Sequence, residues 1–360
     1  MTESIVELAR RLIAIDSVNP ALVPGGAGER EAAHAVAEWS EAQGLDVELV
    51  GPDDRPSVIA RRRGSGGGNS LLLNGHLDTV GVTGMDAPFE ARVEDGRLYG
   101  RGSYDMKGAI AALCVAAAQA TGLHGDVIVT AVADEELGSI GTEAILEHVR
   151  ADAALVAEPT ELQVAVAHRG FVGFEIETAG IAAHGSRPDL GVDAIVKMGP
   201  VLVALDELDG RLRQGARHPL AGPGAVHASL IEGGQEMSSY PARCVLLGER
   251  RTIPGETVDD VERELRALAG DAEVRILAHR DPYEAPAEHD FVRLVGRVAE
   301  SDLVGAPFWT DAALIVEAGI PTVLLGPKGE GAHAAVEWVD VESLGRLRDM
   351  VLAIARSWCN

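Results

Sequence analysis

The residue types best suited to binding a metal ion lie at the end of an apolar run. Residues 71–78 read LLLNGHLD, so that His76 and Asp78 follow three leucines. If this run is a buried strand, both side chains emerge at its carboxyl end, where open α/β sheets bind ligands. Alternate residues of an extended chain face the same way, so Asp78 is placed to orient the imidazole of His76. Taken alone, the stretch fits a capped surface loop equally well.

Three acids and a second histidine occupy comparable positions. Glu136 and Glu158 each follow a predicted strand, and His333 follows a third apolar run. Asp105 immediately precedes a predicted helix. Singly, each fits an exposed turn, or an acid favoured by the helix dipole. Because the carboxyl ends of parallel strands meet at one edge of a sheet, we expect these side chains to converge there.

Together with His76, these residues make a set of two imidazoles and three carboxylates. One bridging carboxylate, with one histidine and one further carboxylate for each ion, would supply ligands for two metal ions. Mixed nitrogen and oxygen ligands suit Zn²⁺ best, and Co²⁺ and Mn²⁺ also fit. We therefore predict two divalent cations as cofactors.

Composition and charge exclude several classes of protein. The 360 residues, 46% of them hydrophobic, are enough for two globular domains. The formal net charge of −25 argues against nucleic acid or an anionic membrane as a partner. Cys114, Cys244 and Cys359 form no CxxC pair, which is typical of a reducing compartment such as the cytoplasm. The amphipathic helix expected at 3–15 differs from a signal peptide, and no run reaches membrane-spanning length.

Hydrophobic periodicity predicts an α/β protein with an inserted second domain. Residues 170–280 read as strand, helix, strand, strand, helix, strand, the order of ferredoxin-like layers. We expect 1–169 and 281–360 to form the metal-binding domain. Helices are expected at 3–15, 29–43, 109–120, 191–208, 257–269, 290–303, 311–318 and 341–357. Strands are expected at 47–50, 58–62, 71–73, 126–133, 153–157, 171–178, 226–231, 242–251, 273–278 and 321–325, with a hairpin at 92–99.

Six short motifs resemble those of one known family. They are GHLDTV at 75–80, GRGSYDMKG at 100–108, DEE at 134–136, EPT at 158–160, AHGSRP at 183–188 and AH at 332–333. In this order the chain resembles the M20-type dinuclear zinc peptidases and deacylases. That family includes acetylornithine deacetylase, succinyl-diaminopimelate desuccinylase, aminoacylase-1 and the glutamate-releasing carboxypeptidases. The resemblance implies a zinc-peptidase-like catalytic domain with a mixed central sheet flanked by helices, and an inserted domain at 170–280 that acts in dimerisation and as a lid.

The resemblance also implies individual roles for the residues of the metal-binding domain. By position, His76, Asp105 and Glu158 would hold one metal, while Asp105, Glu136 and His333 would hold the other, with Asp105 bridging. Asp78 matches the acid that orients the first histidine, and Glu135 matches the general base that takes a proton from the shared water. The peptide bond after Asp105 is expected to be cis, as in relatives.

Three positions of the inserted domain resemble substrate-contacting residues. His184 resembles a histidine that stabilises the tetrahedral oxyanion from the partner subunit, although a surface loop is the competing interpretation. Arg251 resembles the arginine that pairs with the substrate carboxylate, although a strand-edge salt bridge fits as well. Ser238 stands three residues before Pro241, where relatives often carry Asn. Val336 stands where several deacetylases carry Asp. Both departures affect the substrate and leave the metal ligands intact.

The resemblance implies a cytoplasmic, homodimeric amidohydrolase that removes the acyl group from an N-acyl amino acid, as acetylornithine deacetylase does. A carboxypeptidase or dipeptidase, or a succinyl-diaminopimelate desuccinylase, would use the same ligands on a short peptide or a succinyl amide. A metal-binding scaffold without activity is a third alternative, and the presence of Glu135 beside a complete ligand set weighs against it. Substrates with N-acetyl, N-succinyl and dipeptide amides would separate the N-acyl amino acid deacylase from the peptidase and desuccinylase alternatives.

Overall fold

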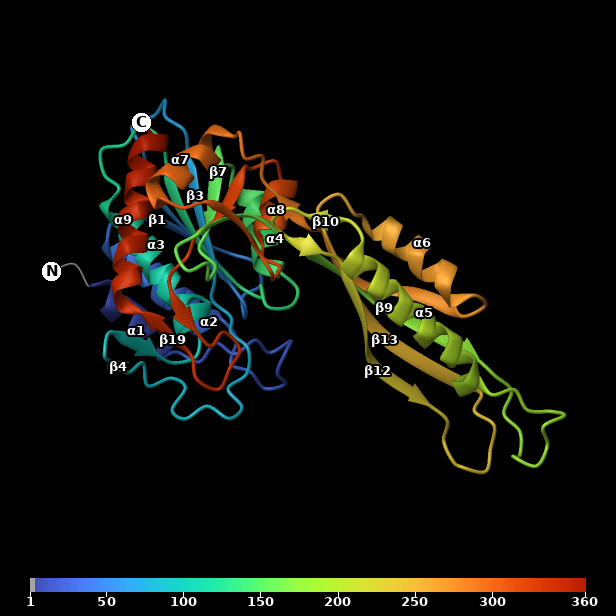
Figure 1. Ribbon diagram of the computed structural model, residues 1–360. Coiled ribbons are helices and arrows are strands. Elements are labelled where there is room, and N and C mark those ends of the chain that lie inside the picture. Colours follow the sequence, from blue (N-terminus) through green and yellow to red (C-terminus); the bar gives the residue numbers. More distant parts are fainter. Residues whose placement is uncertain (1–3) are drawn as a thin grey trace. The chain divides into compact units, whose positions relative to one another are not determined.

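The computed structural model describes residues 4–360, which form two compact units (Figure 1). The first unit comprises the chain up to residue 166 together with 285–304 and 310–360, and the second comprises 167–284 and 305–309. Glu3, in the helix predicted at 3–15, lies outside the described residues. The role predicted for 170–280 in dimerisation stays a prediction.

A mixed sheet forms the centre of the first unit, with strand order β1-β2-β6-β3-β7-β17-β8. β3 runs parallel to β6 and β7, and β17 runs parallel to β7. The carboxyl ends of these four strands therefore lie at one edge of the sheet, as expected. The strands are β1 (Asp46–Val50), β2 (Ser57–Arg62), β3 (Leu71–His76), β6 (Val127–Val132), β7 (Ala153–Val156), β8 (Val164–His168), β16 (Leu303–Ala306) and β17 (Thr322–Leu324).

Helices cover this sheet because its inner strands are buried along their whole length. α3 contacts β3 and β6 and also packs against α1 and α9, and all its residues from Gly108 to Ala117 are buried. The helices are α1 (Ile5–Ile13), α2 (Arg30–Ala42), α3 (Gly108–Gln119), α4 (Ile140–His148), α7 (Asp290–Ala299), α8 (Ala312–Glu317) and α9 (Val341–Trp358). Within residues 4–360, none of the helices has the length and apolar character needed to cross a bilayer.

A small separate sheet of the first unit leads into the Asp105 segment. Its strand order is β18-β19-β5-β4, and β4 and β5 form the hairpin predicted at 92–99. A short π-helical turn, η1 (Ser103–Lys107), follows and runs into α3, and Asp105 and Met106 within it have non-helical backbone angles. The peptide bond between Asp105 and Met106 is cis, as expected. The strands are β4 (Val93–Glu94), β5 (Arg97–Tyr99), β18 (Gly329–Glu330) and β19 (Trp338–Asp340).

The second unit is a four-stranded antiparallel sheet with two helices on one side (Figure 1). The strand order is β12-β13-β9-β14, and the chain follows the predicted strand–helix order. Phe174, Ile176 and Leu246 of the sheet pack with Met198 and Leu205 of α5 in its core. The elements are β9 (Gly170–Ala179), α5 (Ala194–Gln214), β10 (Arg217–His218), β11 (Gly222–Pro223), β12 (Ala225–Gly233), β13 (Arg243–Thr252), α6 (Val258–Ala269), β14 (Glu273–Arg280) and β15 (Tyr283–Glu284).

Two predicted helix ends are wrong, and several elements were not predicted. The helix expected at 191–208 is α5, which begins at Ala194 and continues to Gln214. The helix expected at 290–303 ends at Ala299, because Glu300 adopts a left-handed conformation (φ 50°), and residue 303 already belongs to strand β16. Helix α4 and strand β8 had no counterpart in the prediction, and neither did the short strands β10, β11, β15, β16, β18 and β19. α4 begins after Ser139, a residue type that often caps helices, but Ser139 adopts a left-handed conformation (φ 58°) and makes no side-chain cap hydrogen bond.

Candidate metal centre

The imidazole of His76 is held between two acidic residues at the end of β3. Its Nε2 lies 3.0 Å from Asp105 Oδ1, and its Nδ1 lies 2.9 Å from the main-chain oxygen of Asp78. The Asp78 carboxylate is further away, with Oδ1 at 3.4 Å from Nδ1. Only 1% of His76 is exposed. The main chain of Asp78 therefore contributes more directly to the ring orientation than its carboxylate does.

Asp105 lies between the two histidines of the predicted ligand set. While its Oδ1 faces His76, its Oδ2 lies 3.4 Å from His333 Nε2. His333 Nε2 also lies 3.1 Å from Glu136 Oε2, and Glu158 Oε1 lies 3.8 Å from His76 Nε2. Each of two groups, His76–Asp105–Glu158 and Asp105–Glu136–His333, offers ligand atoms within 4.8 Å of one another. Asp105 is common to both groups, as a bridging ligand must be.

The side chains reach this cluster from different elements. His76 is the last residue of β3, and Glu136 and Glu158 follow β6 and β7. His333 lies in the loop after β18, with a positive φ of 62°. Asp105 comes from η1, which follows β5 of the separate small sheet and directly precedes α3, so it lies just before a helix as expected.

The Asp78 carboxylate positions the acidic turn that follows β6. Its Oδ1 accepts a hydrogen bond from the main-chain N–H of Glu135 (3.1 Å), and its Oδ2 accepts one from that of Glu136 (3.2 Å). A third donor is the side-chain amide of Asn19, 2.8 Å from Oδ2. Asp78 is thus tied both to His76 and to the segment that carries the predicted base.

Burial and crowding of negative charge dominate the electrostatics of the cluster. Burial raises the pKa of Glu158 well above its usual value, and the charges of Asp105 and Glu136 add to the effect. Burial also raises the pKa of Glu136, although a hydrogen bond with His333 opposes this. Hydrogen bonds with Asp105 and Glu136 raise the pKa of His333 to about 10.

This donor set fits divalent cations. Three largely buried carboxylates, with side chains at most 14% exposed, repel one another unless positive charge lies among them. Two divalent ions would neutralise them and lower the carboxyl pKa values. The two imidazole nitrogens and the carboxylate oxygens match the ligand types of Zn²⁺, and they also suit Co²⁺ or Mn²⁺.

His184 and Ser238 are neighbours within the second unit. The main-chain N–H of Gly185 donates to the carbonyl oxygen of Ser238 (2.7 Å), and His184 pairs with Ser239 in an isolated bridge. His184 Nδ1 accepts from the main-chain N–H of Ser186 (3.2 Å), which leaves Nε2 as the donor nitrogen of a neutral ring. Neither residue belongs to the two ligand groups.

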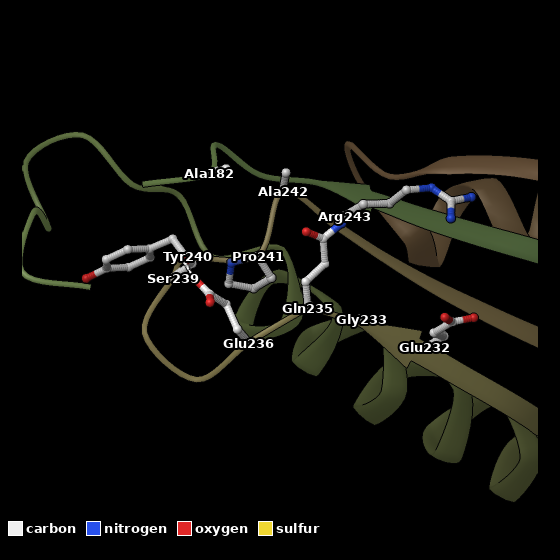
Figure 2. A pocket seen from close by; sticks show the side chains of 11 residues that line it. Ala182, Glu232, Gly233, Gln235, Glu236, Ser239, Tyr240, Pro241, Ala242 and Arg243 are labelled. Atoms are coloured by element: carbon white, nitrogen blue, oxygen red, sulfur yellow. Dashed lines mark hydrogen bonds between the residues drawn. The ribbon is translucent and has the colours of Figure 1, made fainter. Parts of the chain in front are cut away.

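The loop between β12 and β13, which contains Ser238, borders a cavity of about 400 Å³ in the second unit. Figure 2 shows Glu236, Ser239 and Tyr240 of the loop at one end of this cavity, with Glu232 and Arg243 further along the adjoining strands. The cavity therefore combines acidic, basic and aromatic side chains.

Arg251 and its neighbour Arg250 differ in environment. Arg250 is only 2% exposed and pairs with Glu256 and Glu264. Arg251 is partly exposed, pairs with Glu249 (2.6 Å) and has its guanidinium 5.7 Å from the ring centre of Phe171. The partial exposure leaves Arg251 the more accessible of the two guanidinium groups.

Sequence reasoning missed a buried polar network behind the acidic turn. Arg55 donates to both carboxylate oxygens of Glu29 (2.9 and 2.5 Å) and to Asp134 Oδ1 (3.0 Å). Asn19 donates to Asp134 as well as to Asp78. These residues lie in loops and at the start of α2, with no metal-ligand or catalytic spacing. The only signal in the sequence is Arg55, an isolated arginine before β2, and the sequence does not indicate which acids it pairs with.

Comparison with known proteins agrees with this geometry. The family model described as peptidase family M20/M25/M40 matches residues 72–357. The chain belongs to this family. An acetylornithine deacetylase from Myxococcus xanthus is 31% identical over 326 residues, which cover 85% of both chains. An acetylornithine deacetylase from Proteus mirabilis is 29% identical over 377 residues, covering 98% of this chain and 96% of that protein.

Solved structures of M20-type proteins share the fold. Aminopeptidase PepT from Bacillus cereus superimposes with a TM-score of 0.81 at 18% identity, covering 100% of this chain and 99% of that one. The YXEP protein from Bacillus subtilis, described as a dinuclear metal-binding peptidase of the M20 family, gives 0.76 at 17% identity, covering 99% and 97%. The predicted mixed sheet flanked by helices is thus confirmed. As a member of this peptidase family, the protein is a metallohydrolase that acts on amides.

Proposed function

We propose that this protein removes the acyl group from an N-acyl amino acid, using two divalent cations held by the His76 cluster. The observation that carries the proposal is the position of Asp105, with one carboxylate oxygen toward His76 and the other toward His333. The similarity to acetylornithine deacetylases over nearly the whole chain supports the substrate class.

The ligand assignment follows the two groups of side chains. His76, Asp105 and Glu158 would hold one ion, and Asp105, Glu136 and His333 would hold the other. When bound, the two ions would acidify a shared water and polarise the amide carbonyl. We propose Zn²⁺ as the native metal, since imidazole and carboxylate ligands suit it.

Glu135 acts as the general base in this mechanism. Its main-chain N–H is fixed by Asp78, and it adjoins the ligand Glu136 without belonging to either ligand group. Its carboxylate takes the proton of the attacking water and passes it to the leaving amine. Burial raises the pKa of Glu135 well above its usual value in the absence of cations, and bound cations would oppose this shift.

The remaining substrate contacts are assigned to the second unit. The Nε2–H of His184 would stabilise the tetrahedral oxyanion, in the site of a partner subunit. Arg251 would pair with the substrate carboxylate, because a guanidinium fork matches that group. Ser238 lies beside His184 through the Gly185 hydrogen bond, and so would line the same substrate site.

A homodimer is proposed from the exposed apolar side chains of α5 and β12. β12 is an end strand of its sheet, and Leu230 and Ile231 on it are 66% and 53% exposed. Val196 and Val203 of α5 are 69% and 60% exposed. Apolar side chains on an edge strand and an adjacent helix are typical of a surface that another chain covers. We take 170–280 to be the dimerisation domain.

We also propose that the protein acts in the cytoplasm. Cys114, Cys244 and Cys359 are free thiols and all are buried. Three thiols without a disulfide are typical of a reducing compartment.

A substrate panel tests the reaction. Purified protein loaded with Zn²⁺ is offered N-acetyl amino acids, N-succinyl amino acids and dipeptides, and the released amines are quantified. We expect the N-acetyl amino acids to give the highest kcat/KM, and removal of the metals by a chelator to abolish turnover. Faster cleavage of dipeptides would favour the carboxypeptidase or dipeptidase alternative, which uses the same ligands. No hydrolysis of any amide by the metal-loaded protein would reject the proposal.

A further inference from the structure

A buried ion pair connects segments that carry the proposed metal ligands. Arg101 Nη1 donates to Glu337 Oε2 at 2.7 Å, and the two residues are only 2% and 1% exposed. They are 236 positions apart in the chain. Neither belongs to the two ligand groups or to the residues assigned to the reaction.

The Glu337 carboxylate binds the turn that presents Asp105. Its Oε1 accepts hydrogen bonds from the main-chain N–H groups of Tyr104 (2.9 Å) and Asp105 (3.0 Å). Its Oε2 accepts from Gly102 N–H (3.0 Å) in addition to Arg101. One side chain thus satisfies three main-chain donors of η1 and the residue before it, which fixes the position of the proposed bridging carboxylate.

The Arg101 guanidinium extends the connection to two further loops. Its Nη2 donates to the carbonyl oxygen of Ala334 (3.0 Å), the residue after His333. Nη2 and Nε also donate to the carbonyl oxygen of Gly81 (3.0 and 3.2 Å), three residues beyond Asp78. The ion pair therefore joins the loop of His333 to the turn of Asp105.

The two proposed metal subsites depend on this pair to different degrees. His76 ends a fully buried strand and Glu158 follows another, so the central sheet holds both. His333 instead lies in a loop, and its side chain is 54% exposed. Burying an ion pair is costly and contributes little net stability, but hydrogen bonds behind metal ligands orient those ligands.

We infer that Arg101 and Glu337 are positioning residues that set the spacing between Asp105 and His333, and so complete the subsite of Asp105, Glu136 and His333. This inference rests on the proposed two-metal function. It assigns the larger effect of the pair to one of the two ions. Asp105 is common to both subsites, but His76 and Glu158 are held by the central sheet without the pair.

The test is the variant Glu337→Gln, titrated with Zn²⁺ in a calorimeter after removal of metals. An amide replaces one of the two acceptor oxygens by an NH₂ group, which then faces two N–H donors. We expect the wild-type protein to bind two ions. In the variant, the ion of Asp105, Glu136 and His333 should bind about 10- to 100-fold more weakly, and the other ion should lose less affinity, because it shares only Asp105 with that subsite. Glu342→Gln is the matched control, since Glu342 is exposed in the first turn of α9 and the charge change is the same.

Two further variants assign the effect to one subsite. Arg101→Lys keeps the charge but cannot reach the Gly81, Ala334 and Glu337 oxygens together, so it should weaken the same ion, and it carries the test if Glu337→Gln does not fold. His333→Ala should remove that ion. Adding Glu337→Gln to this variant should then weaken the remaining ion by less than Glu337→Gln weakens the ion of Asp105, Glu136 and His333 in the otherwise unchanged protein. Thermal melts of the metal-free variants, followed by circular dichroism, check that each is folded.

The outcomes separate this inference from the proposed function. Two unchanged affinities in folded Glu337→Gln and Arg101→Lys would overturn the inference. Equal weakening of both ions would also overturn it, because the pair would then support the fold and not one subsite. A wild-type protein that binds fewer than two ions would instead reject the two-metal function itself.

Discussion

Asn19 donates its side-chain amide to Asp78 Oδ2 at 2.8 Å, although the two residues are 59 positions apart. The same amide donates to Asp134 Oδ1 at 2.9 Å. Asp78 also accepts hydrogen bonds from the main-chain N–H groups of Glu135 and Glu136. Asn19 therefore holds the acidic turn directly through Asp134 and indirectly through Asp78. The proposed base is thus positioned by a residue of the amino-terminal loop.

Glu135→Gln should keep both metals and lose turnover. The amide cannot take a proton from water, so we expect kcat to fall by about 10²- to 10⁴-fold. Metal content is measured by elemental analysis and turnover by amine release. Glu147→Gln, on the exposed face of α4, is the control. A variant with wild-type turnover would contradict the base assignment, and one that loses metal would make Glu135 a ligand.

Arg55→Met should strongly destabilise the protein. Arg55 pairs with Glu29 and Asp134, whose side chains are 0% and 5% exposed, so the change leaves two buried carboxylates without their cation. We expect the free energy of unfolding to fall by about 3–5 kcal/mol, measured by urea denaturation. Arg63→Met breaks the exposed pair with Asp46 and should cost less than about 1 kcal/mol. An equal fall in the free energy of unfolding in the two variants would contradict the prediction that the buried ion pair matters more than the exposed one.

Lys107→Met should change how stability depends on pH. Burial lowers the pKa of Lys107 from 10.5 to about 7. Between these two pKa values, Lys107 is protonated in the unfolded chain and neutral in the folded one, so the free energy of unfolding of the wild type rises with pH. This contribution to stability is lost as the pH falls through about 7. The variant should therefore gain stability relative to the wild type at low pH, by at least about 1 kcal/mol.

Urea denaturation at about pH 6 and about pH 9 measures this difference. Lys107 Nζ donates to the carbonyl oxygen of Ile15 (2.7 Å), and Lys197 Nζ donates to that of Ala179 (2.9 Å) from an exposed position. Lys197→Met is therefore the control for loss of a lysine with a carbonyl acceptor. A Lys107→Met difference that does not change with pH would contradict the prediction.

Leu230→Arg should convert the proposed dimer into monomers. A charged side chain at this exposed position on the β12 edge cannot be buried without a partner charge. Sedimentation velocity gives the oligomeric state, and kcat should fall with it if His184 acts across the interface. Leu49→Arg, 40% exposed on β1 of the first unit, is the control. A wild-type protein that is monomeric would reject the dimer itself.

Periodicity was sufficient for strand β9 and helix α6, each of which buries one face. Strand β9 alternates between buried and partly buried positions, and it contains the strand predicted at 171–178. Helix α6 starts with a capping box formed by Thr257 and Asp260, and it begins where the sequence predicted. The helix end predicted at 303 was wrong because Glu300 takes the left-handed conformation in place of the usual glycine.

The sequence by itself determined which residues have the chemistry to bind metal ions and in what order they occur, because imidazole and carboxylate groups at the ends of predicted elements are local features. Only the tertiary structure decided that Asp105 faces both His76 and His333. It also brought Glu337 to the Asp105 turn, across 232 positions of the chain. Such contacts depend on how distant segments pack, and no local pattern in the sequence specifies that packing.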